Sequence, residues 1–188
     1  EAAGTSHFVV IDREGNVASM TTTVESLFGC GRAVHGFFLN NQLTDFSFVA
    51  QEDGRPVANA IAPGKRPRSS MSPVIVLDRE GRVVAALGSP GGSAILSYVA
   101  KTLVGVLDWR LTMQQAIDLP NLYARGSDFY GEVAKFTPEL RSALLARGID
   151  VKAGRGEESG LHGVLLRGPS VVEGGADPRR EGVWKAAR

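Results

Sequence analysis

The chain has 188 residues, of which 43% are hydrophobic and 22% charged, and this length and composition favour a single folded domain over residues 1–188. A formal net charge of +1 gives no basic surface for nucleic acid, and no apolar stretch is long and uninterrupted enough to span a membrane. The single Cys30 excludes an internal disulfide, and with three scattered histidines it makes no familiar metal-binding spacing. We therefore expect chemistry without a metal or cofactor.

The first predicted element is a β-hairpin. Residues 6–12 and 17–23 are rich in β-formers and are separated by a polar turn. An apolar run at residues 36–39, expected to be buried, leads into the polar residues 40–45. Residues 50–68 are rich in glycine, proline and charge, which favours an extended surface loop.

The second half of the chain is expected to mix strands and helices in blocks. Strands are predicted at residues 73–77 and 83–87, followed by a glycine loop at 88–93 and a helix at 94–109. Shorter elements complete the prediction: helices at 112–119 and 138–147, and strands at 149–152, 161–166 and 170–173. This order indicates an α+β layered domain rather than a regular βαβ alternation.

Thr5, which follows Gly4 and precedes a strand, is a candidate nucleophile. A threonine hydroxyl needs a base, and the α-amino group of the same residue can serve once it is a chain N-terminus, because its pKa is then about 8. The same hydroxyl could attack the Gly4 carbonyl and so cut the chain there. On spacing alone, a β-forming threonine is the simpler interpretation.

Thr23 and Glu25 lie at the end of the second hairpin strand. Strict alternation would place Thr21, Thr23 and Glu25 on one face, so that a hydroxyl and a carboxylate could serve one pocket. Thr23 could then hydrogen-bond Thr5, and Glu25 could bind a cationic group. A solvated strand edge explains the same pattern.

The glycine loop Gly88–Ser93 is a candidate oxyanion site. Gly91 and Gly92 would present backbone N–H groups where a helix begins, and the helix dipole adds positive potential there. The loop lacks the GK[ST] ending of a phosphate-binding loop. An ordinary strand-to-helix turn is the alternative.

Two further groups of polar residues are candidates for substrate binding. Ser69 and Ser70, set among prolines and basic residues, could donate to a substrate carboxylate. Gln42 and Asp45 could accept hydrogen bonds from an ammonium group. A solvated basic loop and ordinary loop capping are the respective alternatives.

Taken together, these segments resemble the small catalytic subunit of the γ-glutamyltransferases. The resemblance runs from Gly4 to about Arg180 and is carried, in order, by GTSHFVVIDREGN, TTTVES, FFLNNQLTDFS, PGKRPRSSMSP, LGSPGGS and GGADPRREG. It implies a four-layer αββα sandwich of the N-terminal-nucleophile hydrolase type. It also implies a precursor that cleaves itself at Gly4–Thr5 and a heterodimer with a large subunit from the same precursor.

The resemblance further implies roles for the candidate residues. Thr5 would be the nucleophile, Thr23 would hydrogen-bond it, and the N–H groups of Gly91 and Gly92 would stabilise the oxyanion. The remaining residues would bind a γ-glutamyl group, its α-carboxylate by Ser69 and Ser70 and its α-amino group by Glu25, Gln42 and Asp45. The implied reaction splits the γ-amide of glutathione or a related compound through a γ-glutamyl-threonine ester.

Two departures from the family pattern bear on the substrate. Many members have Asn where this chain has Glu25, and residues 48–63 form a shorter stretch than the lid loop of many relatives. We expect a more open pocket, hydrolysis favoured over transfer, and acceptance of bulkier acyl amides. A cephalosporin-acylase-like amidase and an uncleaved, non-catalytic relative are the alternatives.

Residues 1–4 precede the expected nucleophile, so either the chain is uncleaved or its boundary lies upstream of Thr5. These residues have no signal-peptide character, and any targeting signal would lie on a preceding part of a precursor. Family resemblance implies a periplasmic or secreted protein.

Overall fold

The structure is a computed structural model that describes residues 4–154, 158–168 and 171–186. Contacts between residues divide the chain into two compact units. Unit 1 comprises Glu1–Thr5 and Thr23–Ser70, and unit 2 comprises Ser6–Thr22 and Met71–Arg188. The expectation of one domain over residues 1–188 stays a prediction, because a cluster of contacts does not measure independent folding.

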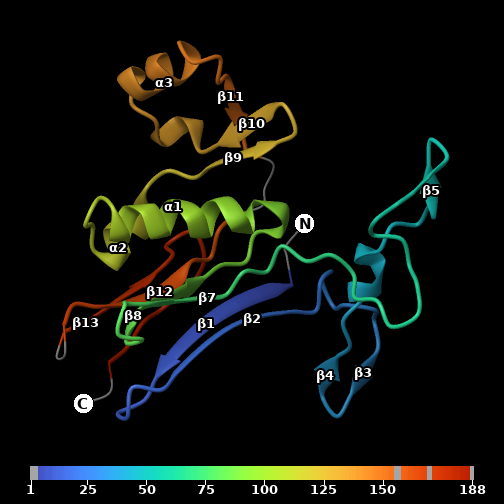
Figure 1. The fold of residues 1–188 in the computed structure, drawn as a ribbon, viewed down its shortest axis with the longest axis horizontal. Helices are drawn as coiled ribbons and strands as arrows, with labels where there is room; N and C mark the ends of the chain where they lie inside the picture. Colours follow the sequence, from blue (N-terminus) through green and yellow to red (C-terminus); the bar gives the residue numbers. More distant parts are fainter. Residues whose placement is uncertain (1–3, 155–157, 169–170, 187–188) are drawn as a thin grey trace. The chain divides into compact units, whose positions relative to one another are not determined.

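The centre of unit 2 is a four-stranded antiparallel sheet with the strand order β13-β12-β8-β7 (Figure 1). Its strands are β7 (Val74–Leu77), β8 (Val83–Gly88), β12 (His162–Leu166) and β13 (Val172–Ala176). β8 is central and almost entirely apolar, as expected of a strand covered on both faces. The strands predicted at 73–77, 83–87 and 161–166 are confirmed within a residue, and the start of the last predicted strand, Ser170, lies outside the described residues.

Two helices cover one face of this sheet. They are α1 (Ile95–Leu107) and α2 (Met113–Asp118). Leu87 packs with Ile95 and Val99 of α1, and Ala85 of β8 and Leu165 of β12 belong to a second cluster that includes residues of both helices. Thr112 begins α2 with a reciprocal capping box that involves Gln115. Within the described residues, no helix is long and apolar enough to cross a membrane.

The opposite face of the sheet is covered by the predicted hairpin, β1 (Thr5–Ile11) and β2 (Val17–Thr23). Because Leu87 points towards α1, a side chain at the next residue, Gly88, would point away from it, and there it would overlap the buried ring of His7. Ser19 Oγ also donates to the Leu87 carbonyl at 3.5 Å. Unit 2 therefore has helices, a sheet and a second β-layer in that order (Figure 1).

A smaller sheet, β11-β10-β9, extends unit 2 beyond α1. Its members are β9 (Leu122–Arg125), β10 (Asp128–Gly131) and β11 (Val151–Ala153), with α3 (Pro138–Leu145) beside them and capped by Thr137. The sequence analysis missed β9 and β10, which are four residues each and contain charged side chains. Stacking of the Tyr123 and Tyr130 rings, with centroids 5.7 Å apart, holds these strands together.

A buried network of charges joins the end of β13 to the smaller sheet. Arg179, whose side chain is 7% exposed, donates to Glu132 at 2.6 Å and to the fully buried Asp177 at 3.0 Å. Burial acts to raise the pKa of the Glu132 carboxyl, but hydrogen bonds from Arg179, Lys135 and the Asn121 N–H lower it to about 2. Glu132 is therefore ionised, and it accepts hydrogen bonds from three separate donors.

Unit 1 consists of short elements joined by loops. They are β3 (Ala33–Val34), β4 (Phe37–Phe38), η1 (Gln42–Asp45), β5 (Gln51–Glu52) and β6 (Arg55–Pro56). The expectation that residues 36–39 are buried is wrong for this chain alone: Phe37 is 73% exposed, because β3 and β4 form a small hairpin whose apolar side chains point outward. The predicted loop at 50–68 is largely irregular, but it also contains the β5–β6 hairpin.

Candidate active site

Thr5 and Thr23 are brought together by the β1–β2 hairpin. Thr5 is the first residue of β1 and Thr23 the last residue of β2, so both lie at the open end of the hairpin. Their side-chain oxygens are 2.8 Å apart, which is hydrogen-bonding distance. Both residues are half-buried.

The chain turns sharply immediately after Thr23. Glu25 has a φ of 70°, and its N–H donates to Thr23 Oγ1 at 2.8 Å. The idea that Thr21, Thr23 and Glu25 share one strand face is therefore wrong, because β2 has ended before Glu25. Thr21 instead hydrogen-bonds His7 Nδ1 at 2.8 Å.

The peptide bond between Gly4 and Thr5 is held against this turn. The Gly4 carbonyl accepts from the Val24 N–H at 3.0 Å and from the Thr23 hydroxyl at 3.3 Å, while the Gly4 N–H donates to the Glu25 carbonyl at 3.1 Å. A Cβ at Gly4 would lie 2.7 Å from Val24 Cγ2, so only glycine fits without displacement. Two donors thus polarise the carbonyl next to the Thr5 hydroxyl.

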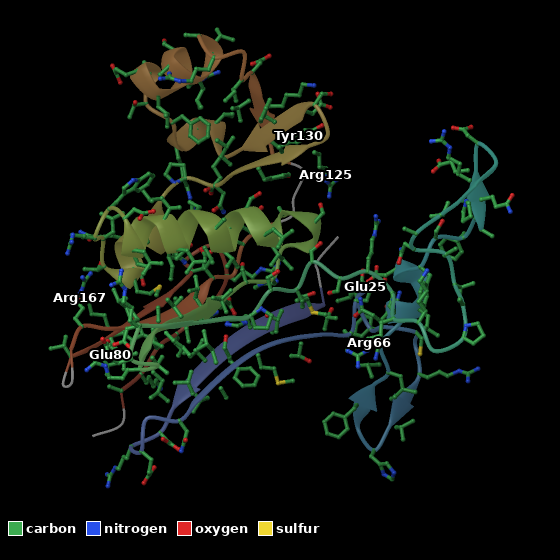
Figure 2. All side chains as sticks on the ribbon, viewed as in Figure 1. Glu25, Arg66, Glu80, Arg125, Tyr130 and Arg167 are labelled. Atoms are coloured by element: carbon green, nitrogen blue, oxygen red, sulfur yellow. The ribbon has the colours of Figure 1, made fainter. Side chains whose placement is uncertain are left out.

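Two carboxylates face a shared amide beside this turn. Gln42 Nε2 donates to Glu25 Oε2 at 3.5 Å and also to Asp45 Oδ2. Burial and the nearby Asp45 raise the pKa of the Glu25 carboxyl, although the hydrogen bond from Gln42 acts in the opposite direction. Because the negative charges of Glu25 and Asp45 repel each other, a cation between them would be bound favourably. Figure 2 labels the Glu25 side chain.

Asparagines fix the backbone around the carboxylates. Asn41 Oδ1 accepts from the Ser26 N–H at 2.9 Å, and its amide donates to the Ser26 hydroxyl. Asn40 Oδ1 accepts from the Gln42 N–H at 2.9 Å. The sequence analysis gave these residues no role, although two asparagines directly before the predicted ligand Gln42 were a usable signal for Asx-type turns.

Asn59 links the acidic residues to the serines. Its amide donates to the Asp45 carbonyl at 2.6 Å, and its Oδ1 accepts from the Arg68 N–H at 3.0 Å. Ser69 and Ser70 follow Arg68 directly, and they are exposed and half-buried respectively. The sequence analysis missed Asn59 because nothing in a long irregular loop distinguishes a bridging asparagine from a solvated one.

Gly91 and Gly92 lie in unit 2, between β8 and α1. Their φ values of 133° and 54° are ones that other residues rarely adopt, and a Cβ at Gly91 would lie 2.6 Å from the Tyr98 ring. Gly92 starts a short 3₁₀ turn, η2 (Gly92–Ala94), that leads into α1. Ser89 supports the loop by accepting from the Gly160 N–H at 3.1 Å, a role the sequence analysis did not predict.

The structure thus connects five of the predicted site residues within unit 1, namely Thr5, Thr23, Glu25, Gln42 and Asp45. The chemical roles assigned to these residues, to the serines and to the glycines stay predictions. Among the described residues, no group of three or more histidine, cysteine or acidic side chains is placed to hold a metal ion.

The layers of unit 2, with the sheet between helices and a hairpin that starts at a threonine, are those of the N-terminal-nucleophile hydrolase fold. The chain belongs to the gamma-glutamyltranspeptidase family, whose model matches residues 1–187. It is similar in structure to the gamma-glutamyltranspeptidase from Pseudomonas nitroreducens complexed with L-DON, with a TM-score of 0.81 and 33% identity over 97% of this chain and 99% of that chain. The predicted α+β fold class is confirmed.

Two curated relatives illustrate the range of the family. The glutathione hydrolase proenzyme of Bacillus subtilis (strain 168) is 41% identical over 128 residues, which are 67% of this chain and 21% of that protein. The acylase ACY 1 proenzyme of Pseudomonas sp. (strain SE83) is 34% identical over 185 residues, 97% of this chain and 32% of that protein. The chain therefore spans about a fifth to a third of the length of these relatives.

Proposed function

We propose that this chain is the catalytic subunit of a γ-glutamyl hydrolase and transferase that acts on glutathione and related γ-glutamyl amides. The observation that carries the proposal is one run of hydrogen bonds from the Thr5 hydroxyl through Thr23 and the Glu25 backbone to the paired carboxylates of Glu25 and Asp45. These hydrogen bonds connect a proposed nucleophile, Thr5, with a proposed cation site at Glu25 and Asp45. Such an arrangement suits an acyl donor that has an ammonium group near the scissile amide. The relatives named glutathione hydrolase support the same substrate class.

Maturation would begin with attack of Thr5 Oγ1 on the carbonyl carbon of Gly4. The C–N bond between Gly4 and Thr5 breaks, an ester to the Thr5 oxygen forms, and water then opens the ester. Charge that develops on the Gly4 oxygen would be stabilised by the donors already present, the Val24 N–H and the Thr23 hydroxyl. The products are a Gly4 carboxylate and a free α-amino group on Thr5.

In turnover, that α-amino group would accept the proton of the Thr5 hydroxyl as it attacks the γ-carbonyl of the substrate. The amine leaves with a proton, and water or a second amine resolves the γ-glutamyl ester. We assign oxyanion stabilisation to the N–H groups of Gly91 and Gly92, where one good donor contributes about 3 kcal/mol. Thr23 would hold the Thr5 oxygen in position for both acylation and deacylation.

The substrate's α-ammonium would lie between Glu25 and Asp45, and its α-carboxylate would accept from Ser69 and Ser70. A bound ammonium offsets the mutual repulsion of the two carboxylates, which explains why both acids are tolerated side by side. Neither acid would favour a glutaryl group, which lacks the ammonium.

The proposed partner is a large subunit cut from the same precursor. The relatives' names describe proenzymes, and this chain covers only part of their length. The outward side of the β1–β2 hairpin supports a partner, because it exposes the apolar side chains of Phe8, Val10 and Met20. Export to the periplasm or secretion is part of the proposal, and fractionation of cells that express the full precursor would test it.

A second candidate function is that of an amidase for other acyl groups, which the similarity to the acylase ACY 1 proenzyme favours. The test is to compare γ-glutamyl-p-nitroanilide with glutaryl-p-nitroanilide, using the full precursor after maturation. We expect release of nitroaniline from the γ-glutamyl compound at a higher kcat/KM. Preference for the glutaryl compound would support the amidase, and an uncleaved protein inactive on both would support a non-catalytic relative.

The balance between hydrolysis and transfer is also open to test. We propose that hydrolysis predominates, because residues 48–63 form a short, exposed stretch with only the small β5–β6 hairpin. Transfer to glycylglycine at saturating acceptor that outpaces hydrolysis would contradict this.

A further inference from the structure

A guanidinium group lies beside the glycine loop and takes no part in the acyl transfer proposed for Thr5. Arg125, the last residue of β9, donates from Nε to Ser93 Oγ at 3.0 Å and from Nη2 to the same oxygen. Ser93 directly follows Gly91 and Gly92. Figure 2 labels the Arg125 side chain, near the end of α1 at which the helix begins.

The position of this guanidinium is set by the fold of unit 2. β9 packs against α1, and the ring of Tyr123, two residues before Arg125, lies edge-on to the ring of Tyr98 in α1 with centroids 6.0 Å apart. Tyr98 and Tyr123 are buried, whereas Ser93 and Arg125 are exposed. The buried contacts therefore hold the strand rigidly while its charged end reaches solvent at the loop.

A second arginine, Arg180, lies near the glycine loop, next to Gly160. A Cβ at Gly160 would lie 2.7 Å from Pro90 Cγ and 2.8 Å from Arg180 Cδ, so the stem of Arg180 and the loop residue Pro90 lie on the same side of Gly160. The Arg180 guanidinium donates to the Glu158 carbonyl at 3.1 Å. Positive charge therefore approaches the glycine loop from two segments of the chain.

We propose that Arg125 binds the carboxylate of the amine half of the substrate and so distinguishes γ-glutamyl amino acids from γ-glutamyl amides whose amine half carries no charge. This inference rests on the proposed function, in which the scissile carbonyl oxygen lies at Gly91 and Gly92. The leaving nitrogen is bonded to the same carbon, so an amino acid attached through that nitrogen has its carboxylate only a few bonds from the loop. Ser93, which accepts the hydrogen bonds of Arg125, directly follows Gly92 in the chain.

The chemistry of the side chain fits this ligand. A guanidinium is planar and carries five N–H donors, and it matches the two oxygens of a carboxylate better than it matches a neutral amide. The same site would receive the carboxylate of an amino acid acceptor in the transfer reaction, because acceptor and leaving amine occupy equivalent positions. The rival interpretation is that Arg125 only ties β9 to the start of α1.

The test compares γ-glutamylglycine with γ-glutamylglycinamide, which differ in the charge of the amine half. The matured full-length protein is assayed for release of glycine or glycinamide. We expect a kcat/KM about tenfold higher for the carboxylate, as a charge-assisted hydrogen bond at a partly exposed site would give. Arg125→Gln should lower kcat/KM more for the carboxylate than for the amide and so bring the two values to within about twofold, and Arg125→Lys should give an intermediate ratio.

The matched control is Arg79→Gln, which removes the same charge from the exposed turn between β7 and β8 and should leave the tenfold ratio intact. An Arg125→Gln variant with an unchanged ratio would overturn the inference. Equal losses on both substrates would also overturn it, since a merely structural role has that effect. A wild-type protein that is inactive on both substrates would instead contradict the proposed function, and the carboxylate site proposed at Arg125 would be contradicted with it.

Discussion

The hydroxyl oxygens of Thr5 and Thr23 lie 2.8 Å apart, although 18 positions separate these residues in the sequence. The β1–β2 hairpin creates this proximity, and the Glu25 N–H fixes the Thr23 oxygen from the other side at 2.8 Å. Because Thr23 accepts from Glu25, its own hydroxyl proton is directed to Thr5 or to the Gly4 carbonyl. Under the proposed function, we therefore expect Thr23 to assist both maturation and turnover.

Replacement of Thr23 by valine removes this hydroxyl and keeps the shape of the side chain. We expect Thr23→Val to slow both cleavage at Gly4–Thr5 and kcat by about 10- to 100-fold, the value of one strong hydrogen bond in the transition state. Thr23→Ser, which restores the hydroxyl, should recover most of both rates. The measurement is the time course of precursor cleavage on gels together with steady-state kinetics, and a valine variant as fast as the serine variant would contradict the role.

The Glu25 carboxyl should make substrate binding pH-dependent. Its pKa is raised by burial and by Asp45, so it becomes neutral at a higher pH than an ordinary glutamate and then attracts an ammonium group less. KM for a γ-glutamyl substrate should therefore rise as the pH falls through this raised pKa. Glu25→Gln should give a high KM that varies less with pH, and a pH profile unchanged by the substitution would rule out this role.

The same substitution should stabilise the ligand-free protein. A carboxyl whose pKa is raised in the folded state contributes stability only while it is protonated, and that contribution is lost as the pH rises through the folded pKa. At neutral pH the ionised Glu25 therefore lowers the stability of the folded state slightly. We expect a higher Tm for Glu25→Gln than for the wild type without ligand at pH 7, measured by calorimetry, whereas a lower Tm would show that the acid is held by favourable contacts instead.

Much of this site could be predicted from the order of motifs, but its geometry could not. Strand alternation placed Glu25 on the same face as Thr23, yet β2 ends at Thr23, and the turn with a φ of 70° at Glu25 brings the backbone N–H of Glu25 to the Thr23 oxygen. A positive φ at a glutamate has no sequence signal, because local propensity disfavours it. The bridging role of Asn59 likewise depends on contacts nine and fourteen positions away.

His7 should make the folded state sensitive to acid. Burial, and then the nearby His162, lower the pKa of His7 from 6.5 to about 4, so the folded protein resists its protonation. The stabilising contribution is full above pH 6.5 and is lost as the pH falls towards 4, by up to about 3 kcal/mol. Urea unfolding of the matured protein at several pH values should show a shallower loss for His7→Gln than for the wild type, and parallel curves would contradict this.

Arg179 should be far more important for stability than a surface arginine. Arg179→Met would leave the fully buried Asp177 without its ion-pair partner and the partly buried Glu132 with Lys135 alone, which costs about 3–5 kcal/mol. Arg82→Met is the control, because Arg82 is 75% exposed in its pairs with Asp78 and Glu80, and such pairs contribute at most about 1 kcal/mol. The denaturant midpoints of the two variants measure both losses of stability. Equal shifts of the midpoint in Arg179→Met and Arg82→Met would show that the buried network contributes little.

The fold was more predictable in its long elements than in its short ones. The hairpin β1–β2, the strands β7 and β8, and the helix α1 follow from alternation and from helical periodicity. β9 and β10 have only four residues each, and they form a sheet because tyrosine stacking and contact with α1 stabilise them, which are tertiary effects. The exposure of Phe37 could not be foreseen, because an apolar run does not reveal whether its partner lies in the same chain.

The most direct test of the nucleophile is the intact mass and N-terminal sequence of the protein expressed as its full precursor, beside a Thr5→Ala variant. We predict that the wild type yields a fragment that begins at Thr5 and that the variant remains uncut. Cleavage of the variant at the same bond, or an intact wild type under conditions in which γ-glutamyl amides are nevertheless hydrolysed, would contradict the assignment of Thr5.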